Sequence, residues 1–238
     1  MKKIVIFIVV FSLVIFSLCA YLIYRTAKDP VSALSYNIDE TKLTVIIDPG
    51  HGGPDGGAVA CDGTAEKDLN LSIALKLSSL LTQRGVQNIL TRSEDISVND
   101  ESAKTLREIK VSDLHNRLKI MNSISNCIYV SIHQNSYRQS KYSGAQVFYS
   151  PNDERSPVLA QCIQQAVKDK LQPDNTRLIK ECTESVYIIY NADKPAVLVE
   201  CGFMTNAQEL ANLKNEEYQH KMASAVADGI LDYINKGS

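Results

Sequence analysis

Hydrophobic residues are concentrated at the start of the chain and then recur in short clusters. Residues 4–24 (IVIFIVVFSLVIFSLCAYLIY) carry no charge, follow Lys2 and Lys3, and end before Arg25. A run of about 20 apolar residues is long enough to cross a hydrocarbon core of roughly 30 Å, and it exceeds the ~7–15 apolar residues of a secretory signal. The pattern therefore predicts an N-terminal membrane anchor, with a cleaved signal peptide as the alternative.

This segment sets the expected organisation of the whole chain. We expect a protein that is membrane-anchored or secreted and that lies on the extracytoplasmic side of the membrane. The expected parts are a signal anchor or signal peptide over residues 1–25, a polar tether over residues 26–41 and a single catalytic domain over residues 42–238.

Beyond the tether, short apolar clusters rich in Val, Ile and Tyr alternate with longer amphipathic stretches. The clusters predict strands at Leu43–Ile47, Val86–Leu90, Cys127–Ile132, Ala145–Tyr149, Val186–Ile189 and Ala196–Val199. The longer stretches predict helices at Ala65–Arg84, Asp113–Ser125, Glu154–Leu171 and Asn215–Asn235. The polar stretch 93–111 predicts a surface loop, and Thr205 with Gln208 predicts a capping box before a further short helix. Strands that alternate with helices indicate an α/β fold, with a largely parallel or mixed central sheet flanked by helices.

Composition and charge exclude several classes of protein. The 238 residues are 45% hydrophobic and 22% charged, which is ordinary for a globular protein, and the net charge of −2 predicts no surface for nucleic acid. The six cysteines form no CxxC pair, so a cysteine zinc site is not expected. A disulfide between Cys162 and Cys182 is left open by the sequence.

Candidate chemistry lies where predicted strands end. The first strand leads into a glycine-rich loop around His51, and this loop lacks the GK[ST] and GxGxxG patterns of phosphate-binding loops. His133 follows the strand 127–132, Glu200 follows the strand 196–199, and Glu66 begins the first long helix. Taken alone, a histidine that follows an apolar strand, as His133 does, is more often a buried structural residue than a ligand. An acid in the first turn of a helix, such as Glu66, more often only complements the helix dipole.

Taken together, these four residues indicate a metal site. In open α/β sheets, ligands bind outside the carboxyl ends of the strands, where these side chains are expected to meet. Two histidines and a carboxylate with an open position are typical of catalytic zinc, and a second carboxylate can act as a base. The sequence contains neither HExxH nor GxSxG, which excludes thermolysin-type peptidases and nucleophile-elbow hydrolases. His115 and His220 lie among polar residues and are expected at the surface.

Seven segments in sequence order carry a resemblance to a known family. They are VIIDPGHGGPDGGA, EKDLNLSIALKLSSLL, LTR, SDLHNRLKIMNS, YVSIHQNS, SGAQVFYS and AVLVECGFMTN, and they extend over essentially the whole region 43–235. The chain resembles the zinc-dependent N-acetylmuramoyl-L-alanine amidases. The resemblance implies one Zn²⁺ per chain held by His51, Glu66 and His133, with Glu200 as the catalytic carboxylate.

The same resemblance implies a substrate and a role. The substrate is the peptidoglycan amide between N-acetylmuramic acid and L-alanine of the stem peptide. A domain without wall-binding repeats behind an anchor is similar to the germination-specific branch, which strips stem peptides from spore cortex so that muramic δ-lactam forms. Asn135 is expected to contact the substrate, whereas Arg92 and Arg117 are expected to form internal salt bridges. An accessory protein is expected to bring a bare domain to its polymer, although the sequence does not identify one.

Three alternatives to this role stay open on the sequence. A vegetative cell-wall amidase would use the same site. A glycoside hydrolase would use Glu66 and Glu200 as its pair of carboxylates, without need of the histidines. A catalytically inactive wall-binding regulator would not need all four polar side chains.

Overall fold

The computed structural model describes residues 11–18 and 38–237, and the chain divides into two units, Met1–Asn37 and Ile38–Ser238. In the first unit, residues 11–18 are helical. No helix within the described residues is both long and apolar enough to span a membrane. Most of the predicted anchor 4–24 lies outside the described residues, so the anchor stays a prediction. The second unit begins at Ile38, and Asp39 N–H donates to Gln87 Oε1 at 2.9 Å. The expected boundaries at residues 25, 41 and 42 stay predictions.

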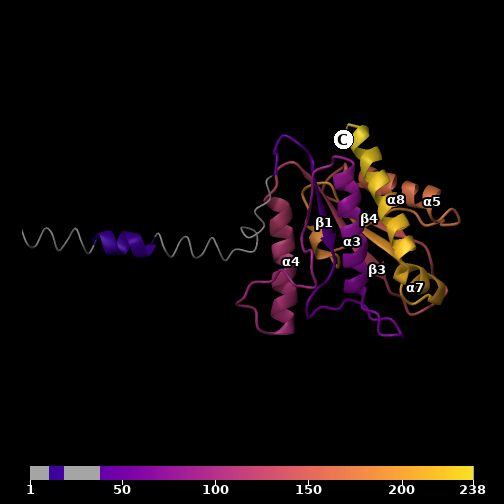
Figure 1. The fold of residues 1–238 in the computed structure, drawn as a ribbon, viewed down its shortest axis with the longest axis horizontal. Coiled ribbons are helices and arrows are strands. Elements are labelled where there is room, and N and C mark those ends of the chain that lie inside the picture. Colours follow the sequence, from indigo (N-terminus) through magenta and orange to yellow (C-terminus); the bar gives the residue numbers. More distant parts are fainter. Residues whose placement is uncertain (1–10, 19–37, 238) are drawn as a thin grey trace, which may run out of the picture. The chain divides into compact units, whose positions relative to one another are not determined.

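The second unit contains six strands and six helices (Figure 1). The strands are β1 (Thr44–Pro49), β2 (Asn88–Leu90), β3 (Cys127–Asn135), β4 (Gln146–Tyr149), β5 (Lys180–Glu181) and β6 (Ala196–Phe203). The helices are α3 (Glu66–Gln83), α4 (Leu106–Asn122), α5 (Ser156–Lys170), α6 (Tyr187–Tyr190), α7 (Ala207–Lys214) and α8 (Glu216–Asn235).

The strands form one mixed sheet in the order β2-β1-β3-β6-β4-β5. The neighbouring strands β2, β1, β3 and β6 are parallel, whereas β4 pairs with β6 in the antiparallel direction. The carboxyl ends of β1, β3 and β6 therefore lie at one edge of the sheet. The expected α/β fold with a mixed central sheet and flanking helices is confirmed.

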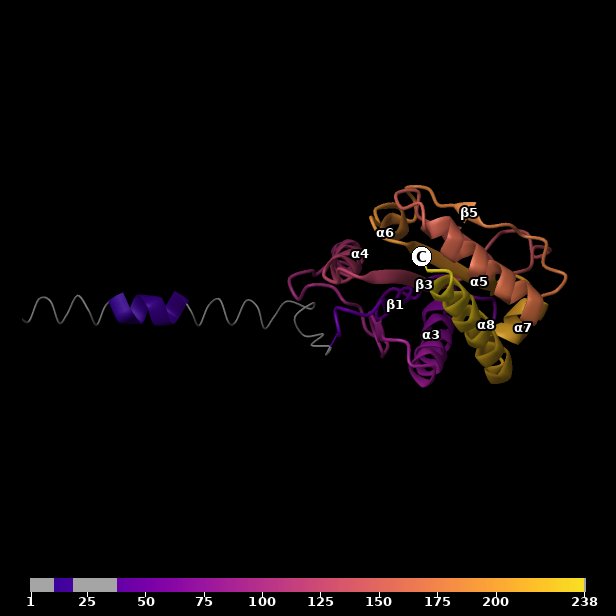
Figure 2. The same ribbon diagram turned by 90° about the horizontal axis from the view of Figure 1, so that it is seen from above.

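Alternating residues of the central strands face two layers of helices. Val45 and Ile47 of β1 and Val197 and Val199 of β6 belong to the main hydrophobic core, which includes residues of α3, α5 and α8. Because side chains alternate across a strand, residues such as Asp48 and Glu200 face the other side. Figure 2 shows α3, α5 and α8 on one side of the sheet and α4 with α6 on the other. The candidate site lies at the carboxyl edge of the sheet, between residues of this second side and the N-terminus of α3.

Two predicted elements are wrong in ways that matter for this second side. The segment Val186–Ile189 is not a strand, because Tyr187–Tyr190 forms the short helix α6. Its apolar residues Ile188 and Ile189 are buried against α4 and β6 rather than paired in the sheet. Helix α4 begins at Leu106, within the stretch 93–111 that was expected to be a loop.

Local hydrogen bonds explain two of the shifted boundaries. Thr105 and Glu108 form a reciprocal capping box that starts α4 in spite of its weak amphipathic pattern. The N-cap of α7 is Asn206, whose side chain accepts from two backbone N–H groups, and not the predicted Thr205. The open question of a disulfide is also answered, because Cys162 and Cys182 are both free thiols.

Candidate active site

The loop after β1 brings His51 to the carboxyl edge of the sheet. His51 has a φ of 64°, a left-handed conformation that is uncommon outside glycine and is found at functional sites. Gly50 precedes it against the imidazole of His133, and a Cβ at Gly50 would lie 2.1 Å from His133 Nε2. Glycine is therefore required there for the close approach of loop and ring.

Three side chains from three elements meet beside this loop. His51 Nε2 lies 3.3 Å from Glu66 Oε2, and His133 Nδ1 lies 2.9 Å from Glu66 Oε1. One ligand atom from each of the three residues lies within 4.8 Å of the others. The structure thus brings together the three residues that the sequence analysis singled out as metal ligands, and their role as ligands stays a prediction.

Glu66 is held in place by neutral hydrogen-bond donors as well as by the histidines. It is 4% exposed, and it accepts from Ala58 N–H at 2.9 Å and from Gln134 N–H at 3.1 Å. Asn70, one helical turn further along α3, adds a donor at 3.3 Å. Burial would raise the pKa of Glu66, but the hydrogen bonds and charges of His133 and His51 hold that pKa well below its usual range. The carboxyl group is thus ionised, as a metal ligand must be.

Asp55 is a residue of the site that the sequence analysis missed. Its Oδ2 lies 2.9 Å from His51 Nδ1, while Lys110 of α4 forms an ion pair with its other oxygen at 3.0 Å. Burial lowers the pKa of His51, but the hydrogen bonds from Asp55 and Glu66 outweigh it and raise the pKa to about 9. A carboxylate behind a ligand histidine fixes the ring orientation and the tautomer. The only sequence signal was an aspartate four residues after the histidine within the glycine-rich loop.

Two buried arginines fix the backbone of the same loop. Arg117 of α4 forms ion pairs with Asp48 and Asp113 and donates to His51 O at 2.7 Å. Arg92 donates to Pro49 O at 2.9 Å and Gly50 O at 3.0 Å. Both arginines are thus internal, as expected, but Arg92 holds backbone carbonyls instead of forming a salt bridge.

Glu200 lies across the strand pair from His133. The two residues are in register between β3 and β6, and a bulge follows at once, so that Asn135 is opposite Phe203. The Oε2 atom of Glu200 is buried and has no hydrogen-bond partner among the described residues. Burial raises the pKa of Glu200 to about 7, although His133 and His51 act against this shift. A carboxyl group with a pKa in this range can both accept and donate a proton near neutral pH.

Three cavities lie around this group of residues. One, of about 190 Å³, is lined by both histidines together with Asp55, Arg117 and Ile188. A second, of about 180 Å³, is lined by Asn135, Tyr137, Tyr142, Arg177 and Phe203.

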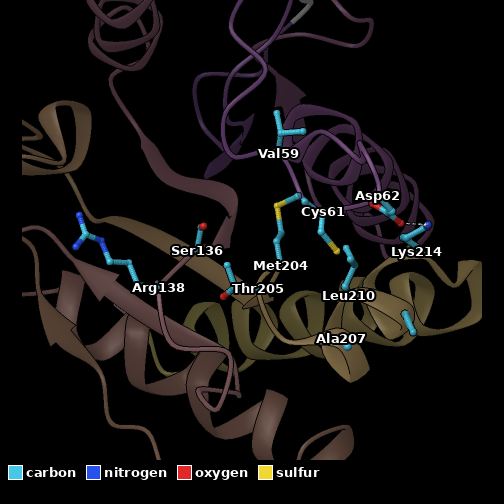
Figure 3. A pocket seen from close by; sticks show the side chains of 12 residues that line it. Val59, Cys61, Asp62, Ser136, Arg138, Met204, Thr205, Ala207, Leu210 and Lys214 are labelled. Atoms are coloured by element: carbon cyan, nitrogen blue, oxygen red, sulfur yellow. Dashed lines mark hydrogen bonds and ion pairs between the residues drawn. The ribbon is translucent and has the colours of Figure 1, made fainter.

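The third cavity is a larger groove of about 620 Å³ between the loop after β1 and helix α7 (Figure 3). Cys61 and Met204 both line it, and two further lining residues, Asp62 and Lys214, form an ion pair at 2.5 Å. The other two histidines, His115 and His220, lie away from the candidate site. Both are exposed on helices, as expected.

Comparison with known proteins agrees with this geometry. A model of the N-acetylmuramoyl-L-alanine amidase family matches residues 45–232. The chain therefore belongs to the N-acetylmuramoyl-L-alanine amidase family, which is the family that its motifs resemble. It is accordingly an amidase that acts on peptidoglycan, and the expected enzyme class is confirmed.

Individual relatives cover most of the described domain. The germination-specific N-acetylmuramoyl-L-alanine amidase of Bacillus subtilis is 36% identical over 192 residues, which are 81% of this chain and 80% of that protein. The CwlD amidase from Clostridioides difficile, solved in complex with the GerS lipoprotein, is 41% identical with a TM-score of 0.78, over 81% of this chain and 98% of that one. The amidase AmiC2 of Nostoc punctiforme is 32% identical with a TM-score of 0.69, over 81% of this chain and 97% of its own.

Proposed function

We propose that this chain is a zinc-dependent amidase that releases stem peptides from spore cortex peptidoglycan. The observation that carries the chemistry is the convergence of His51, Glu66 and His133 beside the unpaired oxygen of Glu200. Two imidazoles and one carboxylate are a donor set for catalytic zinc, and the unpaired Glu200 oxygen fits a group reserved for reaction. One zinc ion per chain is expected.

The residues of the chain divide the chemistry between them. Bound zinc would polarise the amide carbonyl and acidify the attacking water. Glu200 then takes a proton from that water and returns it to the leaving nitrogen of L-alanine, since an unprotonated amine anion is a poor leaving group. As ligands, His51 and His133 would be neutral, so His51 would release on metal binding the proton that its pKa of about 9 otherwise retains. Asp55 holds the ring of His51 through its Nδ1 atom. Asn135, two residues beyond His133, faces the substrate.

The role in spores rests on the relatives. Two of them are named as a germination-specific amidase and as CwlD, and the chain is 36% and 41% identical to them. Removal of the stem peptide frees the lactyl group of N-acetylmuramic acid, which is the chemistry that muramic δ-lactam formation requires. Because the CwlD amidase was solved with a lipoprotein, we propose that this chain also works with an accessory protein outside the cytoplasm.

We further propose that residues 1–25 direct the protein out of the cytoplasm as a signal anchor or signal peptide, and that residues 26–41 tether the catalytic domain 42–238. The uncharged run 4–24 behind two lysines supports this. Fractionation of the full chain and of residues 26–238 tests it. Recovery of both forms in the same soluble cytoplasmic fraction would contradict the proposal.

The experiment that tests the activity is mass spectrometry of muropeptides after incubation of peptidoglycan with zinc-loaded protein. The amidase releases free stem peptides and leaves glycan strands with bare lactyl groups. New reducing ends in place of free peptides would identify a glycoside hydrolase, and unchanged polymer would identify a wall-binding protein. Elemental analysis of the same sample should give one zinc per chain, and full activity without metal would contradict the zinc assignment.

A further inference from the structure

The small cavity lined by Arg177 lies beside the proposed catalytic carboxylate. Phe203 of β6 lines it three residues beyond Glu200, and Asn135 of β3 lines it two residues beyond His133. The bulge between β3 and β6 brings these two side chains into register. Its volume of about 180 Å³ admits a single amino-acid residue. A group bound there would be close to the site of reaction.

Arg177 brings a positive charge to this cavity and has no carboxylate partner. Its guanidinium lies over the ring of Phe203, 5.0 Å from the ring centroid. Its Nη2 atom donates to Gln146 Oε1, and its Nε atom is buried without a hydrogen-bond partner in the described part of the chain. No described acidic side chain forms an ion pair with it. A partly buried arginine that lacks a direct ion-pair partner gains free energy when an anion binds to it.

The surrounding contacts hold Arg177 in this position. Gln146 is opposite Glu200 in the sheet, and its Nε2 atom donates to Leu178 O at 2.8 Å, which directs its oxygen toward the guanidinium. The nearby acid Glu209 is already occupied, because its two oxygens accept from Gly144 N–H at 2.8 Å and from Phe203 N–H at 2.7 Å. The protein thus orients the arginine near the charges of Glu200 and Glu209, but neither of these acids forms an ion pair with it.

We propose that Arg177, together with Asn135 and the ring of Phe203, forms a subsite for a carboxylate of the stem peptide. This inference rests on the proposed function, because it places the peptide beside the amide that is cleaved. The uncleaved glycan strand carries no charge once its lactyl groups are amidated, so the peptide is the part of the substrate that supplies an anion. Guanidinium binds carboxylates through paired hydrogen bonds that a neutral amide cannot match. The side-chain amide of Asn135, which also lines the cavity, adds a second donor.

Two muramyl peptides provide the test. They differ only at the residue after L-alanine, which carries a free carboxylate in one and a primary amide in the other. The wild-type protein should cleave the carboxylate form with a kcat/KM roughly 10- to 100-fold higher, mainly through KM, as expected for a charge-assisted contact. Arg177→Gln should cleave both forms at the rate of the amidated substrate, with unchanged zinc content. Arg177→Lys keeps the positive charge but lacks the planar guanidinium group that forms paired hydrogen bonds. This variant should therefore retain part of the preference for the carboxylate substrate.

Matched variants establish whether the preference belongs to this subsite. Arg107→Gln, at an exposed arginine of α4, should keep the wild-type preference. The inference is overturned if the wild-type protein cleaves both substrates equally, a result that needs no variant to fold. It is also overturned if Arg177→Gln lowers both rates by one factor, as a glycan contact or a structural role would, or if Arg138→Gln in the larger groove abolishes the preference instead. Cleavage of neither substrate would refute the proposed function itself.

Discussion

The two sides of the candidate metal site differ in how completely their buried charged groups are paired. On the side of β1 and α4, which we call the scaffold side, the buried charges of Asp48, Arg92 and Arg117 are all engaged within the chain. On the side of β6 and β4, which we call the open side, Glu200 Oε2 and Arg177 Nε are buried without partners among the described residues.

This difference indicates which groups serve the fold and which are kept for the substrate. An unpaired buried polar atom costs free energy, so a fold retains one where something outside the chain completes it. The buried charges of the scaffold side are all paired, although the buried hydroxyl of Tyr129 has no hydrogen-bond partner among the described residues. Arg117 of this side also donates to the backbone carbonyl of His51. On the open side, we propose that the substrate supplies the missing partners. Loss of a charged group on the scaffold side should therefore lower the stability of the fold. Loss of one on the open side should instead slow the reaction.

The largest expected effect is on the open side. Glu200→Gln keeps the shape of the side chain but cannot accept a proton, so turnover should fall by ~10²–10⁴-fold while zinc is retained. His133→Ala should lose both zinc and activity. Zinc stoichiometry and muropeptide turnover, measured on the same preparations, check both outcomes. If Glu200→Gln loses its zinc, the residue is a ligand, and if turnover stays near normal, another group is the base.

The sequence was sufficient to predict the proposed ligands of the candidate metal site and Glu200, but it did not predict the role of Arg177. His51, His133 and Glu200 follow apolar strands, so a local pattern placed them at one sheet edge once the strands were taken as parallel. The unpaired Arg177 depends on the antiparallel strand β4, which brings Gln146 to it from far along the chain. No periodicity signals such a contact.

The scaffold side was also only partly predictable. Helix α4 has a weak amphipathic pattern because its inward face carries Asp113 and Arg117, which are buried as an ion pair instead of as apolar residues. The segment of α6 is rich in Ile and Tyr, which favour strands, but its position against α4 decides its structure. In both cases tertiary contacts outweighed the local preference.

The next effect is on stability and belongs to the scaffold side. Arg117→Met removes a buried cation and leaves Asp48 and Asp113 without their partner, so the free energy of unfolding should fall by about 3–5 kcal/mol. Arg177→Gln, on the open side, should lower it much less. Chemical denaturation of both variants measures the contrast. Equal losses in the two variants would contradict the division into two sides.

A smaller effect is expected at Asp55, which lies behind the proposed metal ligand His51. Asp55→Asn keeps a side chain next to His51 but removes the negative charge that orients the ring, so zinc affinity should fall by ~10–100-fold. Asp95→Asn is the matched control, because Asp95 bonds Gly53 N–H of the same loop at 2.8 Å and does not contact His51. Competition with a chelator measures the affinities. If both variants lose zinc to the same extent, the effect comes from the loop and not from the orientation of the ring.

The smallest expected effect is in the acid stability of the scaffold side. Burial would raise the pKa of Asp48, but the charge of Arg117 and the hydrogen bonds of Thr91 and Ser131 hold it well below its usual range. An acid whose folded pKa is lower than its unfolded value of about 3.9 stabilises the fold above that pH, and this contribution is lost as the pH falls toward the folded pKa.

The stability difference between the wild-type protein and Asp48→Asn should therefore be constant near neutral pH and shrink below about pH 4, since only the wild-type protein loses this interaction on protonation. Denaturation at a series of pH values measures the difference, with Asp232→Asn at an exposed position of α8 as the control. A difference that stays constant down to low pH would show that the hydrogen bonds of Asp48, which the asparagine partly keeps, outweigh its charge. In that case, hydrogen bonding and packing around Asp48 would stabilise the scaffold side more than its ion pair with Arg117 does. The two sides would then differ in hydrogen bonding and not in the pairing of charges.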